Sequence, residues 1–132
     1  MSISNYIPVR EVMTAEIEMI DGLTSVAEAL ERLRSKQISS LIIERRDDSD
    51  EYGLLTVHDI AKGVLVPGLS PERVSAYEIM TKPVLSIDVA MNIRYAVRLL
   101  SRFSLSRALV LENGNAAGIV TLRDMVLRCQ DF

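Results

Sequence analysis

The chain has 132 residues, a formal net charge of −3, and 48% hydrophobic beside 25% charged residues. This composition is typical of one globular domain and excludes a disordered chain, and the acidic balance argues against nucleic acid and membrane surfaces as partners. No apolar stretch reaches the roughly 18 residues that a membrane span requires, and the first residues lack the pattern of a signal peptide. We therefore expect a cytoplasmic protein.

In the first half of the chain, the pattern predicts a helix, two strands and a closing helix. Ser25 and Glu28 have the spacing of a capping box, and apolar residues follow at helical spacing through Leu33. The runs 41–43 and 53–57 are short and nearly all apolar, as expected of strands covered on both faces. Residues 59–65 have the pattern of a short helix, and the predicted order is strand, helix, strand, strand, helix.

The second half repeats this order. Before it, residues 66–69 predict a turn, and residues 70–72 predict the start of a helix with proline at its first position. The repeated elements are a helix capped by Asn92, strands at 108–111 and 118–122, and a final helix at 124–129.

A single cysteine, Cys129, falls in that final helix, where we expect a buried small side chain. One cysteine cannot form an internal disulfide or build a zinc site, which agrees with a reducing compartment. No cluster has metal-ligand spacing and no serine has an evident base partner, so the sequence predicts neither a metal site nor a catalytic residue.

The two halves are copies of one unit. Val12-Met13-Thr14 returns as Ile79-Met80-Thr81, and Gly53–Asp59 returns as Gly118–Asp124 with glycine, threonine and aspartate in register. The spacing between copies shortens by two residues because the first copy has a longer loop at 45–52, which a duplicated fold tolerates. Repeats of about 60 residues are marginally stable alone, so we expect repeats 1–68 and 69–132 to form one compact domain.

The repeated Gly-x-x-Thr-x-x-Asp puts a hydroxyl and a carboxylate at each strand-to-helix junction. Thr56 and Thr121 end strands, while Asp59 and Asp124 fall in the first helical turns. Backbone N–H groups there favour anions, and a carboxylate can accept two hydrogen bonds from a ribose diol, which together describe a nucleotide. The same pattern also caps helices, so the residues alone leave both interpretations open.

In these features the chain resembles a tandem pair of cystathionine-β-synthase (CBS) domains. The resemblance covers nearly the whole chain and rests on the two repeat openings, the segments 38–40 and 105–107, and the two Gly-x-x-Thr-x-x-Asp motifs. It implies an α+β fold of two βαββα repeats packed through their sheets with pseudo-two-fold symmetry. It also implies two clefts that commonly hold AMP, ADP, ATP or S-adenosylmethionine, in a regulatory role without catalysis.

The resemblance assigns residues to each cleft crosswise, because each cleft in the family draws on both copies. In cleft 1 it places the ribose on Asp124, a ribose or phosphate contact on Thr121, and the phosphate near Arg107. The adenine wall of cleft 1 then comprises Thr14, Ile17, Ile38 and Ser39. The weaker cleft 2 comprises Ser40, Thr56, Asp59, Thr81, Val84, Leu105 and Ser106.

The two clefts differ at one position, where Arg107 is matched by Ser40. Arginine offers phosphate a fixed fork of donors and serine offers one hydroxyl, so cleft 1 should hold a phosphorylated ligand more tightly. We expect cleft 2 to be empty or to take an uncharged adenosine compound. Lys82 and Arg123 flank the motifs within reach of a phosphate, and the acidic loop 47–51 is expected to be solvated and mobile.

The leading hypothesis is an adenine-nucleotide sensor, with AMP as the first choice of ligand, no catalytic cofactor, and a homodimeric state. Its occupancy would regulate an enzyme or transporter encoded elsewhere. The alternatives are a dimerising interaction scaffold with vestigial clefts and a sensor of S-adenosylmethionine or adenosine. An enzyme acting on nucleotides is the least supported, because no nucleophile, metal-ligand set or paired acid and base is evident.

Overall fold

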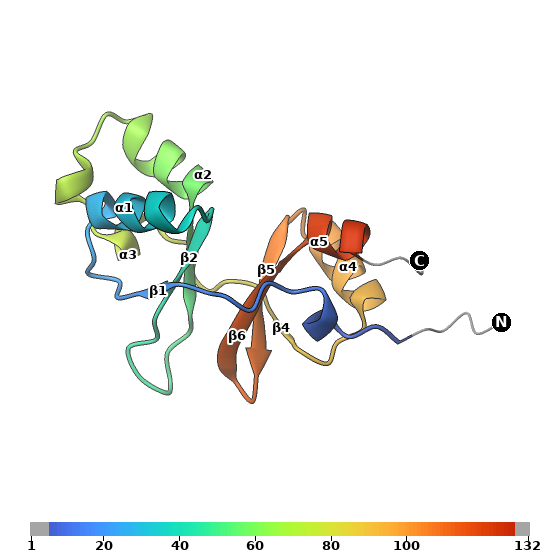
Figure 1. Cartoon of the computed structure of the whole chain (residues 1–132). Coiled ribbons are helices and arrows are strands. Elements are labelled where there is room, and N and C mark those ends of the chain that lie inside the picture. The colour runs from blue at the N-terminus through green and yellow to red at the C-terminus, as the bar shows by residue number, and fades with distance from the viewer. Residues whose placement is uncertain (1–5, 129–132) are drawn as a thin grey trace. The chain divides into compact units, whose positions relative to one another are not determined.

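A computed structural model describes residues 6–128 of the chain (Figure 1). Cys129, which the sequence predicts in the last helix, lies outside the described residues. The described chain forms two compact units: unit 1 joins the segment that ends at Ile17 to the segment that begins at Leu85, and unit 2 is Glu18–Val84. The opening segment of each sequence repeat therefore packs in the unit that holds the other repeat's sheet.

Unit 2 contains a three-stranded sheet in the order β1-β2-β3, with β1 parallel and β3 antiparallel to β2. Its strands are β1 (Met19–Ile20), β2 (Ser40–Ile43) and β3 (Gly53–Thr56). Its helices are α1 (Val26–Lys36), α2 (Val57–Ile60) with the π-helical turn η2 (Ala61–Leu65), the 3-10 turn η3 (Pro71–Arg73), and α3 (Ala76–Ile79).

Local sequence signals set the limits of α1. The Ser25 hydroxyl accepts a hydrogen bond from the Glu28 N–H at 3.1 Å, which caps the first turn as predicted. Gln37 ends the helix in the left-handed conformation with φ of 54°. Apolar side chains of α1 pack on one face of the sheet in the buried core of unit 2, which includes Val26, Ala29, Leu33, Leu41, Ile43 and Leu55.

Unit 1 repeats the architecture with a sheet in the order β4-β5-β6. Asn92 caps its long helix through a hydrogen bond from the Arg94 N–H to Oδ1 at 3.1 Å, as predicted. A two-residue turn at Asn113 and Gly114, both with positive φ, joins β5 to β6. The elements are η1 (Val9–Glu11), β4 (Ser86–Asp88), α4 (Ile93–Arg102), β5 (Arg107–Glu112), β6 (Asn115–Thr121) and α5 (Leu122–Arg128).

The predicted α+β class and the repeated order of elements are confirmed. The helix expected over 59–65 begins earlier, at Val57, and changes to π-helical geometry at Ala61. The helix expected from residue 70 is only the short turn η3, because Val74 is extended and α3 starts separately at Ala76. None of the helices described between residues 6 and 128 is long and apolar enough to cross a bilayer.

Candidate functional site

In each unit, a short extended segment lies against the outer edge of the strand that carries the threonine motif. Thr14 exchanges two backbone hydrogen bonds with Ile119 of β6, at 2.8 and 3.0 Å. Thr81 does the same with Leu54 of β3, at 2.8 and 2.9 Å. The two threonines at the repeat openings are thereby placed beside the strands that end at Thr121 and Thr56.

Strand register puts the candidate residues of unit 1 on one face of its sheet. Arg107 of β5 is paired directly with Thr121 of β6. Ala108, Val110 and Val120, which alternate with them, belong to the helix-covered core. Because side chains alternate between faces along a strand, Arg107, Thr121 and the bridged Thr14 share the face away from that core. A guanidinium and two hydroxyls thus lie on the same sheet face of unit 1.

Asp124 lies where this face meets α5. Its backbone N–H donates to the Thr121 hydroxyl at 3.0 Å, so Thr121 caps the helix. One carboxylate oxygen lies 3.5 Å from Nε of Arg128, and the Asp124 side chain is 20% exposed. Arg128 also donates to the carbonyl oxygen of Val12 at 3.1 Å, which ties the helix to the segment carrying Thr14. Sequence reasoning did not single out Arg128, although its spacing of four residues from Asp124 on a helix is a signal for an ion pair.

The equivalent site in unit 2 has the same frame and different side chains. Ser40 of β2 is paired with Thr56 of β3, and Ser40 is only 8% exposed. Here the cap is reciprocal: the Asp59 N–H donates to the Thr56 hydroxyl at 3.1 Å, and the Thr56 N–H donates to the Asp59 carboxylate at 2.9 Å. The carboxylate of Asp59 is therefore partly committed to its own helix.

The residues predicted for each cleft belong partly to unit 1 and partly to unit 2. Within unit 2, the carbonyl oxygen of Ser39 accepts from the Val57 N–H at 3.1 Å, and within unit 1 that of Ser106 accepts from the Leu122 N–H at 2.9 Å. Ser39 and Ser106 thus each lie beside the threonine motif of their own unit. Unit 1 holds Thr14, Ile17, Leu105, Ser106, Arg107, Thr121 and Asp124, and unit 2 holds Ile38, Ser39, Ser40, Thr56, Asp59, Thr81 and Val84.

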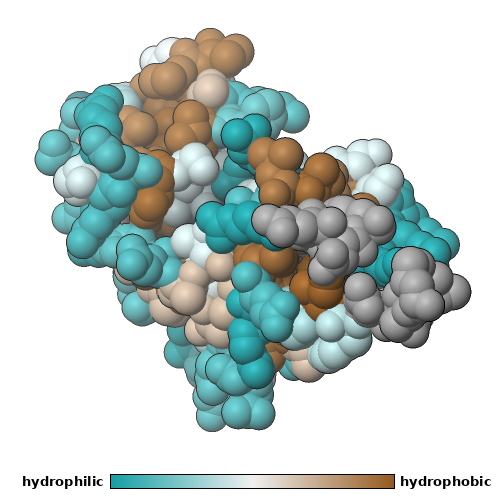
Figure 2. Space-filling view, turned by 45° about the vertical axis from the view of Figure 1, so that its right-hand side comes forward, coloured by the Kyte–Doolittle hydropathy of each residue, from teal (hydrophilic) through white to brown (hydrophobic). Residues whose placement is uncertain are grey.

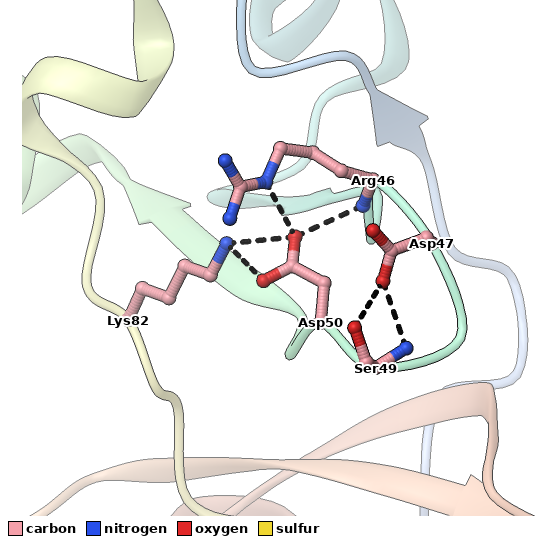
Figure 3. A network of polar contacts seen from close by, with 5 residues as sticks. All are labelled: Arg46, Asp47, Ser49, Asp50 and Lys82. Atoms are coloured by element: carbon pink, nitrogen blue, oxygen red, sulfur yellow. Dashed lines mark hydrogen bonds and ion pairs between the residues drawn. The ribbon is translucent and has the colours of Figure 1, made fainter.

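The acidic loop of unit 2 forms ion pairs that the sequence did not predict. The Asp50 side chain is only 9% exposed and accepts from Nζ of Lys82 at 2.8 Å and from Nε of Arg46 at 3.1 Å (Figure 3). These two cations, Lys82 foremost, hold the pKa of the Asp50 carboxyl well below its usual range. The prediction of a simply solvated loop is wrong at Asp50, and the charge of Lys82, expected within reach of a phosphate, is matched by this carboxylate.

Among the residues that the structure describes, no group of three or more acidic, histidine or cysteine side chains is arranged to hold a metal ion. The candidate site of unit 1 combines the hydroxyls of Thr14 and Thr121, the guanidinium groups of Arg107 and Arg128, and the carboxylate of Asp124.

Both repeats match the model of one protein family. The model of the CBS domain matches residues 9–66 and again residues 76–131. The chain belongs to the CBS domain family. It is a tandem CBS pair, and it carries the fold of regulatory ligand-binding modules, as the resemblance implied.

Two archaeal relatives are similar over nearly the whole chain. An uncharacterized protein of Methanopyrus kandleri is 29% identical over 89% of this chain and 62% of its own length. An uncharacterized 33.4 kDa protein encoded in a ribosomal RNA operon of Thermofilum pendens is 24% identical over 96% of this chain and 45% of its own length. The chain thus spans about half to two thirds of these relatives.

Solved structures share the fold closely. The hexameric CBS-CP12 protein from bloom-forming cyanobacteria superposes with a TM-score of 0.89 at 30% identity, over 93% of this chain and 68% of that one. An uncharacterized conserved protein from Pyrococcus horikoshii gives 0.83 at 26% identity, over 98% and 96%. The CBS pair of protein MJ0100, solved with 5′-methylthioadenosine and S-adenosyl-L-methionine, gives 0.78 at 22% identity, over 94% and 96%.

Proposed function

We propose that this CBS pair is a regulatory module that binds an adenine nucleotide, with AMP favoured, on the Arg107 face of unit 1. One observation carries the proposal: β-sheet register sets Arg107 directly beside Thr121, three residues before Asp124. A phosphate would bind the guanidinium of Arg107, and the ribose diol would bind the carboxylate of Asp124. Ile38 and Ser39, which the resemblance adds as part of the adenine wall, belong to unit 2 and stay a prediction.

The difference between Arg107 and Ser40 sets the expected preference for a phosphorylated ligand. A hydrogen bond to a charged group contributes about 1.5–3 kcal/mol, roughly twice the value for a neutral pair. The buried hydroxyl of Ser40 offers unit 2 no comparable cation at this register position. Unit 2 therefore takes an uncharged adenosine compound, or none, under this proposal.

The bound ligands of one structural neighbour support the adenosine part of the proposal. The CBS pair of MJ0100 was solved with 5′-methylthioadenosine and S-adenosyl-L-methionine, which both carry adenosine. That neighbour is similar in fold at 22% identity, so an S-adenosylmethionine or adenosine sensor is the alternative ligand class. The module senses its ligand without chemistry on it and acts in the cytoplasm, where reducing conditions suit a chain with a single cysteine.

Ligand-induced stabilisation tests this function directly. AMP at about one hundred times its Kd should stabilise the native state by about 2.7 kcal/mol, which a thermal melt would report as a rise in Tm. After prolonged incubation, native mass spectrometry should still show bound AMP with its original mass, because the module does not convert its ligand. If neither AMP, ADP, ATP, adenosine nor S-adenosylmethionine shifts the Tm, the sensing function is wrong.

A second candidate function, a dimerising scaffold, is favoured by apolar residues that reach the surface on short helices of both units (Figure 2). Leu65 and Val66, at the end of η2 in unit 2, are 60% and 82% exposed, and Val126 and Leu127 on α5 of unit 1 are 52% and 63% exposed. Apolar side chains gathered on one element are typical of protein interfaces. We propose that these helices form a homodimer through which occupancy reaches an enzyme or transporter.

Light scattering after gel filtration measures this assembly. The wild-type chain should have the mass of a dimer, and Leu65→Glu with Leu127→Glu should give the monomer mass because charges are costly at a buried interface. Leu23→Glu, at a leucine that is 76% exposed outside these helices, is the matched control and should stay dimeric. A monomeric wild-type chain would refute the scaffold role.

A further inference from the structure

A pocket lies in unit 2, away from the Thr56–Asp59 motif. It has a volume of about 470 Å³, and Ile43, Met80, Tyr77 and Leu23 form its apolar walls. Strand pairing runs from Ser40 with Thr56 at one end of β2 to Ile43 with Gly53 at the other. Ile43 is also part of the helix-covered core, whereas Ser40 faces away from it. The pocket therefore lies at the opposite end of β2 from the Thr56–Asp59 motif.

The matching region of unit 1 shows why unit 2 has room for a pocket there. The Arg10 N–H donates to the Val89 carbonyl oxygen in unit 1, and the Tyr77 N–H donates to that of Gly22 in unit 2, so Arg10 and Tyr77 are equivalent. By the same repeat spacing, Glu112 is equivalent to Arg45. In unit 1, Nη2 of Arg10 and the carboxylate of Glu112 are joined by an ion pair at 3.0 Å.

That ion pair spans the positions that line the pocket in unit 2. Tyr77 and Arg45 cannot form it, because one side chain is neutral and the other is a cation. The guanidinium of Arg45 instead lies 4.6 Å from the centroid of the Tyr52 ring, and Tyr77 is 52% exposed. Where unit 1 has an ion pair, unit 2 therefore has a pocket with an aromatic side chain in its wall.

The polar rim of the pocket is built by Lys82 and by the loop 45–52, which is longer than its counterpart in the second repeat. The Asp50 carboxylate accepts hydrogen bonds from Nε of Arg46 at 3.1 Å and from the Arg46 backbone N–H at 2.9 Å. It also forms an ion pair with Lys82 (Figure 3). The Arg46 side chain is 84% exposed, and its two terminal nitrogens have no hydrogen bond within the described residues. They therefore remain available as an oriented pair of donors.

Two acids also line the pocket, Asp21 and Glu44. The carboxylate of Asp21 accepts the Leu23 N–H at 2.7 Å, which commits one of its oxygens to the turn that carries Leu23. Three cations, Arg45, Arg46 and Lys82, also line the pocket, and Asp50 pairs with two of them, Arg46 and Lys82. A mostly apolar pocket of this size, with a few fixed polar groups, has the properties of a small-molecule site, whose volumes are about 300–1,000 Å³.

We propose that this pocket binds a small organic anion with an apolar, preferably aromatic, body. The body lies between Tyr77 and Leu23 over Ile43 and Met80, and the anionic group lies against the terminal nitrogens of Arg46. The site is independent of the proposed nucleotide site, since it uses none of that site's residues. It gives unit 2 a ligand function that unit 1, where an ion pair joins the equivalent positions, does not share.

Fluorescence titration of the full chain with anilinonaphthalene sulfonate tests the pocket. The matched neutral probe is N-phenyl-naphthylamine, which has the same aromatic body without the sulfonate. Tyr77→Arg with Arg45→Glu installs the ion pair of unit 1, and it should weaken binding of both probes at least about tenfold. Leu23→Ser changes a 76% exposed side chain, so it leaves the fold intact and should weaken binding about threefold.

Charge recognition is tested separately. The sulfonate probe should bind about tenfold more tightly than the neutral probe, and Arg46→Gln should remove this preference. AMP should not displace either probe, which separates this site from the proposed nucleotide site. Saturable binding that survives both the Tyr77→Arg/Arg45→Glu and Leu23→Ser changes would overturn the pocket assignment. Equal affinity for the two probes, or displacement by AMP, would overturn the anion preference or the independence of the site.

Discussion

The two units of this CBS pair share a backbone plan and differ at both ends of their sheets. At the motif end, unit 1 has Arg107 where unit 2 has the buried Ser40. At the other end, unit 1 has an ion pair between Arg10 and Glu112, whereas unit 2 has Tyr77 and a lined pocket. The two units therefore share a backbone scaffold and differ in the side chains at each end of the sheet.

This difference shows that a repeated backbone need not carry repeated side chains. Backbone hydrogen bonds place equivalent residues identically, as those of Thr14 with Ile119 and of Thr81 with Leu54 show. The side chains at these equivalent positions decide whether a cation, a hydroxyl or an open space results. Substitutions that exchange residues between units are thus the sharpest tests of the comparison.

The largest effect on folding should come from the glycine that begins each motif. A Cβ on Gly118 would come within 2.7 Å of the Thr14 carbonyl oxygen, while one on Gly53 would be 3.4 Å from that of Thr81 and 2.7 Å from the movable Met80 sulfur. Overpacking typically costs about 1–3 kcal/mol, so Gly118→Ala should destabilise within this range and Gly53→Ala by less. Urea denaturation measures the free energy of unfolding of both variants. An equal decrease would show that the two glycines are packed equally tightly.

Exchange of Arg107 and Ser40 should change nucleotide affinity. Arg107→Ser should weaken AMP binding about tenfold or more and leave adenosine binding nearly unchanged, because only the phosphate contact is lost. Ser40→Arg should in turn strengthen phosphate-dependent binding in unit 2. Titration calorimetry with AMP and adenosine separates the two effects, and an equal loss for both ligands would place Arg107 away from the phosphate.

The ion pairs of Asp50 with Lys82 and Arg46 predict that the stability of unit 2 depends on pH. Because the pKa of Asp50 is lowered in the native state, the carboxylate stabilises the fold above the ordinary aspartate pKa of about 3.9, and the contribution is lost as the pH falls from there toward the lowered value. The Tm difference between the wild-type chain and Asp50→Asn should therefore be full at neutral pH and narrow below about pH 4. A difference independent of pH would show that Asp50 acts through packing alone.

The smallest effect should come from the ion pair of unit 1. Arg10 and Glu112 are 54% and 53% exposed, and exposed pairs contribute about 0.2–1 kcal/mol. Arg10→Gln should therefore cost less than about 1 kcal/mol, and about 1 M salt should abolish the difference. A larger, salt-resistant loss in urea denaturation would mean that Arg10 packs rather than pairs.

Local patterns predicted the fold because each one has a local physical cause. The caps at Ser25 and Asn92 depend on hydrogen bonds within three residues, and the strands depend on short apolar runs, so both were found at the expected places. The limits of α2 and η2 were less well predicted. Gly63 of η2 packs so closely on Ile79, a residue distant in sequence, that an added Cβ would come within 2.8 Å of the Ile79 side chain.

The cap geometry at the candidate site was predictable for the same reason. The junction of Thr121 with Asp124 is local, and its hydrogen bond lies where the motif predicts it. The contact of Asp50 with Lys82 joins residues 32 positions apart, and no local pattern indicates it. The pocket depends on the differences between Arg10 and Tyr77 and between Glu112 and Arg45, which alignment of the two repeats reveals only when residues outside the motifs are compared.

The most direct test of the account is calorimetric titration of AMP into Asp124→Ala and Asp59→Ala, two equivalent changes in the two units. Loss of a charged hydrogen-bonding partner costs about 1–3 kcal/mol, so Asp124→Ala should weaken the tightest AMP binding about ten to one hundred times. Asp59→Ala should leave that binding step within about threefold of the wild-type value. Equal weakening by both changes, or none by Asp124→Ala, would contradict the assignment of the nucleotide site to unit 1.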